Sequence, residues 1–191
     1  MLIGKKAPSF SAQAMINGAI QDITLKDYAG FMKVLVFYPL DFSFVCPTEL
    51  HAFQDSIDEF TKRNTMVLGL SVDSVYSHVA WWEKPKKMGG LAGVSFPLVS
   101  DITKTIARDY GVLDEEKGFA ARGLFILDTE DTIQHLEINN VSLGRNTTEV
   151  LRILDAISFV KERGEACPVN WLAGDTGIKQ NEQGLIDYFS K

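Results

Sequence analysis

The sequence predicts one α/β domain with a strand-helix-strand unit at its centre, followed by a C-terminal tail. Residues 34–38 form an unbroken apolar run with β-branched and aromatic side chains, closed by Pro39, which is typical of a strand buried on both faces. Residues 46–60 carry apolar side chains at helical spacing. Residues 66–72 form a second apolar run, ended by Asp73. A strand, a helix and a strand in this order indicate the parallel β-α-β pattern.

The first 30 residues predict an N-terminal hairpin or an irregular cover over the core. Asn17-Gly18 has the composition of a tight turn, and residues 20–26 follow it. Residues 27–30 form a second turn-like segment before the buried strand.

The helix after the first buried strand is expected to begin at Cys46-Pro47. Proline fits only in the first turn of a helix, because its missing N–H would have had no helical partner there. Cys46 is therefore expected at or just before the helix N-terminus, where unpaired N–H groups and the macrodipole favour a thiolate. One face of this helix carries the apolar positions Leu50, Phe53, Ile57 and Phe60.

Four further segments follow the second apolar run. Residues 77–84 predict a helix stopped by Pro85, and its two tryptophans are expected to pack against the sheet or against a neighbouring protomer. The glycine-rich residues 89–93 predict a loop that lacks the phosphate-binding patterns. Residues 96–100 predict a short edge strand, and residues 103–110 predict a helix closed by a glycine.

The last third of the chain predicts a hairpin, a helix and a tail. Residues 123–127 and 133–138 read as two strands joined by a polar turn. Residues 147–160 predict an amphipathic helix, capped at Asn146 or Thr147 and ended near Gly164. The remaining polar residues predict an extended tail with a short terminal helix. The expected division is a domain of residues 1–164 and a tail of residues 165–191.

Composition excludes several classes of function. A chain of 191 residues with 46% hydrophobic residues can bury a full core. Its formal charge of −6 argues against binding to nucleic acid or to a membrane surface, which requires a basic face. The lysines of residues 84–87 are interpreted as a solvated helix end. No signal-peptide core and no apolar stretch of about 18 residues is found, so a cytoplasmic protein is expected.

Two cysteines, Cys46 and Cys167, stand far apart in the sequence. This is neither a dense disulfide framework nor a C-x-x-C pair, so the thiols are either inert packing or sites of transient redox chemistry. Ser43 stands three residues before Cys46 and Arg122 precedes a strand, so a hydroxyl and a cation could reach the thiol or its substrate. Lowering a thiol pKa from ~8.5 to ~6 raises the thiolate fraction at pH 7 about thirtyfold, or about 2 kcal/mol. Catalysis also requires donors that align the electrophile and stabilise the leaving atom.

Other uses of Cys46 fit the sequence less well. A C-x5-R phosphatase loop requires arginine at position 52, which is Ala52. His51 is about 140° around the helix from Cys46, so it is poorly placed as the base of a hydrolase. A zinc site requires four suitably spaced ligands, and a thioredoxin-type reductase normally has a second cysteine where Glu49 stands.

Several segments together resemble the typical 2-Cys peroxiredoxins, including the peroxidase component of bacterial alkyl hydroperoxide reductase. They are Pro39-Leu-Asp-Phe-Ser-Phe-Val-Cys46-Pro-Thr-Glu49, Asp101-Ile-Thr-Lys104, Arg122-Gly-Leu-Phe125, Gly144-Arg145-Asn146 and Gly164-Glu-Ala-Cys-Pro168. The resemblance covers nearly the whole chain. It implies a thioredoxin-like fold, with a central mixed sheet flanked by helices and an extended C-terminal tail, and it implies a peroxidase cycle.

The resemblance also implies a role for each matching residue. Cys46 matches the peroxidatic cysteine, Pro39 shields it, and Ser43 occupies the hydroxyl position, where threonine is commoner. Arg122 matches the arginine that contacts thiolate and peroxide.

Three further positions match supporting or resolving residues of the family. Glu49 and Arg145 match the polar residues that orient the active-site arginine. Cys167 matches the resolving cysteine, which attacks the sulfenic acid of the partner protomer and forms an intersubunit disulfide.

The resemblance implies a hydroperoxide substrate, thioredoxin or a flavoprotein reductase as electron donor, and a homodimer that assembles into a decamer. No flavin, haem or metal motif occurs in the sequence, so no cofactor is expected. Ala92 departs from the Gly-Gly-Leu-Gly pattern of members sensitive to overoxidation, whereas their C-terminal Tyr188-Phe189 is present. A holdase chaperone or peroxide sensor is the alternative interpretation, and it differs from a peroxidase in lacking sustained turnover with a reductant.

Overall fold

The computed structural model describes residues 2–190. The chain divides into two compact units, one ending at Arg145 and the other beginning at Asn146. The predicted boundary after residue 164 stays a prediction. No helix in the described part of the chain is long and apolar enough to cross a membrane.

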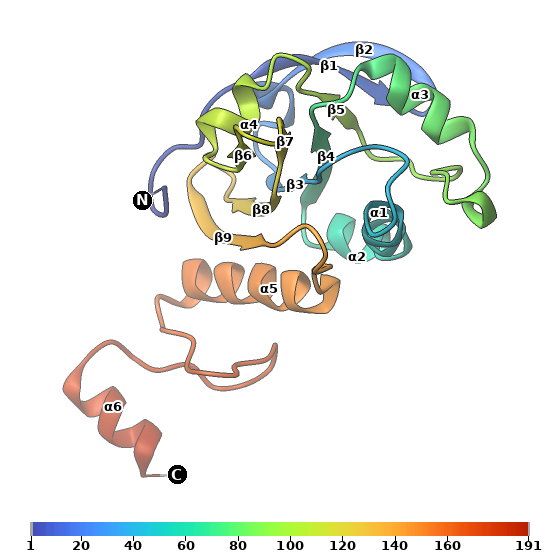
Figure 1. The fold of residues 1–191 in the computed structure, drawn as a ribbon. Helices are drawn as coiled ribbons and strands as arrows, with labels where there is room; N and C mark the ends of the chain where they lie inside the picture. Colours follow the sequence, from blue (N-terminus) through green and yellow to red (C-terminus); the bar gives the residue numbers. More distant parts are fainter. Residues whose placement is uncertain (1, 191) are drawn as a thin grey trace. The chain divides into compact units, whose positions relative to one another are not determined.

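The first unit is built on a mixed sheet of seven strands, counted over the described residues (Figure 1). The strand order is β2-β1-β5-β4-β3-β8-β9. β3 pairs in parallel with β4, and β4 with β5, whereas the other neighbours are antiparallel. The strands are β1 Ser11–Ile16, β2 Ala19–Thr24, β3 Met32–Phe37, β4 Thr65–Ser71, β5 Leu98–Ser100, β8 Arg122–Leu127 and β9 Ile133–Asn139.

The predicted β-α-β unit is confirmed, with one difference in its helix. The chain passes from β3 through α1 (Cys46–Asp55) and α2 (Ile57–Lys62) into β4. The sequence predicts one helix here, but Ser56 leaves helical geometry and its N–H bonds Phe53 O at 3.2 Å. Phe53 and Phe60 still pack ring to ring at 5.7 Å, so the apolar stripe stays continuous across the break.

The N-terminal hairpin is confirmed, and its pairing corrects another prediction. β1 and β2 meet at the Asn17-Gly18 turn. β5 is an interior strand, so the prediction of an edge strand over residues 96–100 is wrong. β1 covers its outer side through the pairs Ala14–Val99 and Met15–Leu98. A three-residue strand has no local pattern that reveals a partner so distant in sequence.

Two helices begin at other residues than predicted, because a side chain caps each start. α3 (Val75–Glu83) begins early, since the Ser74 hydroxyl accepts from Ser77 N at 3.2 Å. α4 (Thr105–Asp109) begins late, since the Asp101 carboxylate accepts from the N–H groups of the first helical turn at 3.0 and 2.7 Å.

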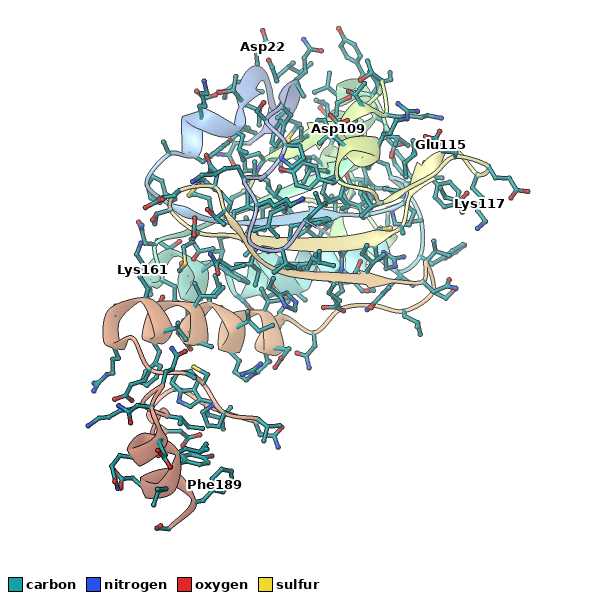
Figure 2. The ribbon with its side chains drawn as sticks, turned by 90° about the vertical axis from the view of Figure 1, so that its left-hand side faces the viewer. Asp22, Asp109, Glu115, Lys117, Lys161 and Phe189 are labelled. Atoms are coloured by element: carbon teal, nitrogen blue, oxygen red, sulfur yellow. The ribbon has the colours of Figure 1, made fainter. Side chains whose placement is uncertain are left out.

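Several short elements have no counterpart in the predictions. They are the 3₁₀ helices η1 (Leu25–Tyr28) and η2 (Lys86–Met88) and the hairpin of β6 (Leu113–Asp114) with β7 (Phe119–Ala120). Glu115 and Lys117 project outward from the turn of this hairpin (Figure 2). Strands of two residues are too short to show alternation.

One face of the sheet carries a large apolar cluster, which includes Leu35, Phe37 and Phe125 from the central strands. Tyr110 lies 5.3 Å from the Phe37 ring and 5.0 Å from the Phe125 ring. On the other face α1 approaches β4 at Gly69, where an added Cβ would lie 3.5 Å from Leu50. The central strands are therefore covered on both faces, as their apolar sequences predict.

The second unit contains α5 (Thr147–Arg163) and α6 (Glu182–Phe189). The predicted cap of the longer helix is confirmed, because Asn146 Oδ1 accepts from Thr148 N at 2.9 Å, and Gly164 ends it in the left-handed conformation at φ +66. The segment between the helices is irregular apart from a bridge between Ala166 and Ile178. Phe189, at the end of α6, is labelled in Figure 2.

Candidate active site

The loop between β3 and α1 delivers Cys46 to the first position of a helix. Cys46 is fully buried and is the first residue of α1, with Pro47 in the first turn as predicted. The N–H groups of Thr48 and Glu49 both bond the Val45 carbonyl, at 3.0 and 3.2 Å. The sulfur therefore lies at the N-terminal, positive end of a ten-residue helix.

Arg122 is the cation of the site. It is the first residue of β8 and 2% exposed. Its Nη1 donates to Cys46 Sγ at 3.3 Å and to Glu49 Oε2 at 2.7 Å. Its Nε donates to the Val141 carbonyl at 2.7 Å. The guanidinium is thus held from two sides while one nitrogen faces the sulfur.

The Glu49 carboxylate lies between two buried arginines. Arg145 donates to it through Nε at 2.7 Å, Nη2 at 2.8 Å and the backbone N–H at 2.8 Å. Burial acts to raise the Glu49 pKa, but the hydrogen bonds and charge of Arg145 and the charge of Arg122 outweigh it and hold the pKa below its ordinary value. Glu49 therefore stays ionised in the fold.

Arg145 connects this carboxylate to the sheet. Its Nη1 donates to the carbonyls of Phe37 in β3 and Gly123 in β8, at 2.8 and 2.7 Å. These bonds tie α1 to the two strands that carry the loop and Arg122. The position of Arg122 is consequently set by packed secondary structure, which is what a preorganised site requires.

Pro39 and Ser43 lie in the same loop, as expected. Pro39 is buried. The half-buried Ser43 hydroxyl donates to the Leu40 carbonyl at 2.8 Å, within its own turn, and not to the thiol. Its oxygen retains acceptor capacity, so a contact with substrate stays a prediction.

A buried polar network also holds this loop, and sequence reasoning missed it. Tyr38 donates to Asp41 Oδ1 at 2.9 Å, and His78 Nδ1 lies 2.8 Å from Asp41 Oδ2. Asp41 N donates to Asp73 Oδ2 at 2.9 Å, and the Ser71 hydroxyl donates to the same oxygen at 2.7 Å. The polar residues that follow each buried strand were the available signal, because parallel strands end at the same edge of a sheet.

Within the first unit, a hydrogen bond also attaches α1 to the glycine-rich loop. His51 Nε2 lies 2.9 Å from the Gly90 carbonyl, and both groups are buried. This imidazole therefore has a structural partner in that loop, in agreement with the prediction that it is poorly placed as a base for Cys46. Within residues 2–190, no group of three or more His, Cys, Asp or Glu side chains is arranged to hold a metal ion.

Cys167 lies in the second unit, and both thiols are free. Its side chain is half-buried, and Sγ lies 3.8 Å from the Ala156 carbonyl of α5. Burial raises the pKa of the Cys167 thiol, and the charge of Arg152 partly offsets that effect. The structure thus gives the two cysteines different surroundings, one beside a fixed cation at a helix start and one beside a helix flank.

Known proteins match this chain along its whole length. Residues 3–136 match the sequence model of the AhpC/TSA family, and residues 156–191 match that of the C-terminal domain of 1-Cys peroxiredoxin. The 2-Cys peroxiredoxin BAS1 of Hordeum vulgare, named chloroplastic, is 48% identical over 99% of this chain and 90% of its own. Peroxiredoxin-2 of Bos taurus is 47% identical over 99% and 95%. The reduced 2-Cys peroxiredoxin of Plasmodium vivax has a TM-score of 0.96 at 40% identity, covering both chains completely.

Proposed function

The chain belongs to the AhpC/TSA family of peroxiredoxins, has their thioredoxin-like fold and is a thiol-dependent peroxidase, and on this premise we propose that Cys46 is the residue that attacks the peroxide. The observation that carries the assignment is the 3.3 Å hydrogen bond from Arg122 to Cys46 Sγ at the start of α1. A fixed cation and a helix N-terminus both favour a thiolate, which is the reactive form of cysteine.

In the first step the Cys46 thiolate attacks one oxygen of a hydroperoxide. The S–O bond forms as the O–O bond breaks, and the attacked oxygen keeps its hydrogen or takes one to give the sulfenic acid. The leaving hydroxide or alkoxide takes a proton and departs as water or alcohol. Negative charge moves onto the leaving oxygen, and the donors of Arg122 are placed to stabilise it. Ser43 is assigned to hold the peroxide, and Pro39 to shield the thiolate from water.

In the second step Cys167 of the partner protomer resolves the sulfenic acid. Its thiolate attacks the Cys46 sulfur, the S–O bond breaks, and hydroxide leaves and is protonated to water. Cys46 is fully buried, so the first turn of α1 must open before the sulfurs can meet. Local opening of a helix end is less costly than global unfolding. Glu49 and Arg145 are assigned to orient Arg122 in the closed site.

An external dithiol then returns two electrons by thiol–disulfide exchange. We assign this role to thioredoxin or a flavoprotein reductase, acting on a homodimer that assembles into a decamer. Two isolated free thiols suit a reducing compartment, and the cytoplasm is the compartment proposed. Size-exclusion chromatography with light scattering, on reduced and on oxidised protein, tests the assembly directly.

The test of the assignment is a non-reducing gel with intact mass, on protein treated with one equivalent of hydrogen peroxide. The expected result is a dimer-sized band in the wild type that is absent from Cys46→Ser and from Cys167→Ser. Cys46→Ser is expected to lose peroxide turnover, and Cys167→Ser to consume about one peroxide per chain without recycling through a disulfide. A monomeric wild type whose Cys46 gains one oxygen would remove Cys167 from the cycle.

A further inference from the structure

One face of α5 carries a cation beside the second thiol. Glu149, Arg152 and Ala156 follow each other at spacings of three and four, so they share a face of the helix. Arg152 Nε and Nη2 each donate to the Glu149 carboxylate at 2.7 Å. This bidentate pair holds the guanidinium in a single orientation. The Cys167 sulfur lies 3.8 Å from the carbonyl of Ala156, one turn farther along.

The remaining nitrogen of the Arg152 guanidinium, Nη1, holds the segment that follows Cys167. It donates to the Trp171 carbonyl at 3.1 Å. Trp171 is 3% exposed, packs 4.8 Å from the Phe159 ring and donates through Nε1 to the Asp175 carbonyl at 3.1 Å. The turn that carries the thiol is therefore anchored to α5 by one arginine and one aromatic contact.

Arg152 and Cys167 also interact electrostatically. Burial raises the Cys167 pKa, and the Arg152 charge acts in the opposite direction. Other charged groups stand on the segments that pack together here. They include the acids Glu149, Glu165 and Asp175 and the cation Arg163, which lies 5.7 Å from the Phe159 ring. Of the acids, Glu149 is already paired with Arg152.

We propose that Arg152 is a positioning residue for the resolving reaction, which holds the turn of Cys167 against α5 and stabilises its thiolate as that thiolate forms. This inference rests on the proposed role of Cys167 as the resolving cysteine. The attacking electron pair belongs to the Cys167 sulfur, so a cation fixed near that sulfur favours the ionised state that attacks Cys46. The same cation favours Cys167 as the leaving thiolate when an external dithiol reduces the disulfide.

The size of the effect follows from thiol chemistry. Raising a thiol pKa by one unit lowers the thiolate fraction at neutral pH about tenfold, while the greater nucleophilicity of the remaining thiolate offsets this about threefold. The reaction rate at neutral pH therefore falls about threefold for each unit by which the pKa rises.

A purely structural role for Arg152 predicts the opposite sign. If the arginine only anchored the turn, its loss would expose the thiol to water, and the pKa would fall toward its ordinary value. If the charge acts on the thiol, its loss raises the pKa further. The direction of the pKa change therefore separates the two roles.

The experiment uses the full-length Cys46→Ser protein, in which Cys167 is the only thiol. The rate of alkylation by iodoacetamide is measured across the neutral and alkaline pH range, and its midpoint gives the pKa of Cys167. Arg152→Gln is expected to move the midpoint upward and to slow alkylation at neutral pH, whereas Arg152→Lys, which keeps a charge, is expected to stay closer to the parent. A midpoint that is unchanged or lower in Arg152→Gln overturns the inference.

Lys161→Gln is the matched control, because it removes one positive charge from the opposite side of the same helix, about 180° around from Arg152. Its midpoint is expected to equal that of the parent, and an equal upward shift in both glutamine variants overturns a specific role for Arg152.

The same variants with Cys46 restored separate the role of Arg152 from the proposed function. Loss of the disulfide band in the wild type defeats the proposed function, whereas an intact band with no midpoint shift defeats only the role of Arg152.

Discussion

Glu49 and Arg122 form a buried ion pair of 2.7 Å directly behind the Cys46 thiol. Glu49 lies one turn along α1 from the cysteine, whereas Arg122 begins β8, a strand much later in the chain. The carboxylate is itself held by Arg145. The cation at the sulfur is thus fixed by a charge network and not by the sulfur alone, and the following predictions test this arrangement.

Glu49→Gln is expected to destabilise the fold by about 3 kcal/mol, because removal of one partner leaves buried charges uncompensated. The measurement is equilibrium unfolding in urea at pH 7 and equal protein concentration. Glu59→Gln is the control, since Glu59 pairs with Lys62 on the surface, where ion pairs contribute little. Equal unfolding midpoints in the two variants would contradict a role for the buried network in stability.

The contribution of Glu49 is expected to depend on pH in one direction. Its pKa in the fold lies below the ordinary value, so the ionised group stabilises the fold above its unfolded pKa of about 4.3, and this stability is lost as the pH falls through the folded pKa. The difference in free energy of unfolding between wild type and Glu49→Gln should therefore be constant above about pH 5 and shrink below about pH 4. A difference that grows on acidification would refute the assignment.

Arg122→Lys is expected to slow the reaction of Cys46 with hydrogen peroxide about 100-fold, the scale seen when a preorganised donor is lost. The lysine ammonium is a point charge, so it does not reproduce the hydrogen bonds that the planar guanidinium makes to Cys46, Glu49 and the Val141 carbonyl. The second-order rate constant is measured by competition with a haem peroxidase. Circular dichroism checks that the variant is folded, and a folded variant with the wild-type rate would exclude Arg122 from the peroxide step.

Gly90→Ala is expected to destabilise the fold by about 2 kcal/mol, because overpacking forces the backbone to shift. An added Cβ at Gly90 would collide with the Lys84 backbone carbonyl, and the Gly90 carbonyl holds His51 of α1. Gly89→Ala is the matched control, since its Cβ would enter open space at φ +73 and costs only about 1 kcal/mol. Thermal unfolding compares the stability of the two variants. A larger loss of stability in Gly89→Ala would contradict the expectation, because it would show that the loop shifts to accommodate a Cβ at Gly90.

Sequence reasoning succeeded for several features whose cause is local. The apolar run of β3, Pro47 in the first helical turn and the Asn146 cap depend on contacts within a few residues, and the structure confirms all three. The family resemblance also named Glu49, Arg122 and Arg145, but it could not supply the bonds among them. Glu49 and Arg145 are 96 positions apart in sequence.

The sequence by itself determined the fold class, the helix start at Cys46 and the peroxidase chemistry. Apolar periodicity and proline geometry act over short distances along the chain, and the family motifs can be read directly from the sequence. Only the tertiary structure decided that β5 is an interior strand, that Ser43 bonds its own turn and that Asp41 joins Tyr38 and His78. Ser43 and Leu40 are only three residues apart, whereas the interior place of β5 and the contact between Asp41 and His78 depend on which distant segments share a sheet edge or a buried pocket. Such partners are selected by the packing of the whole unit, which no local pattern encodes.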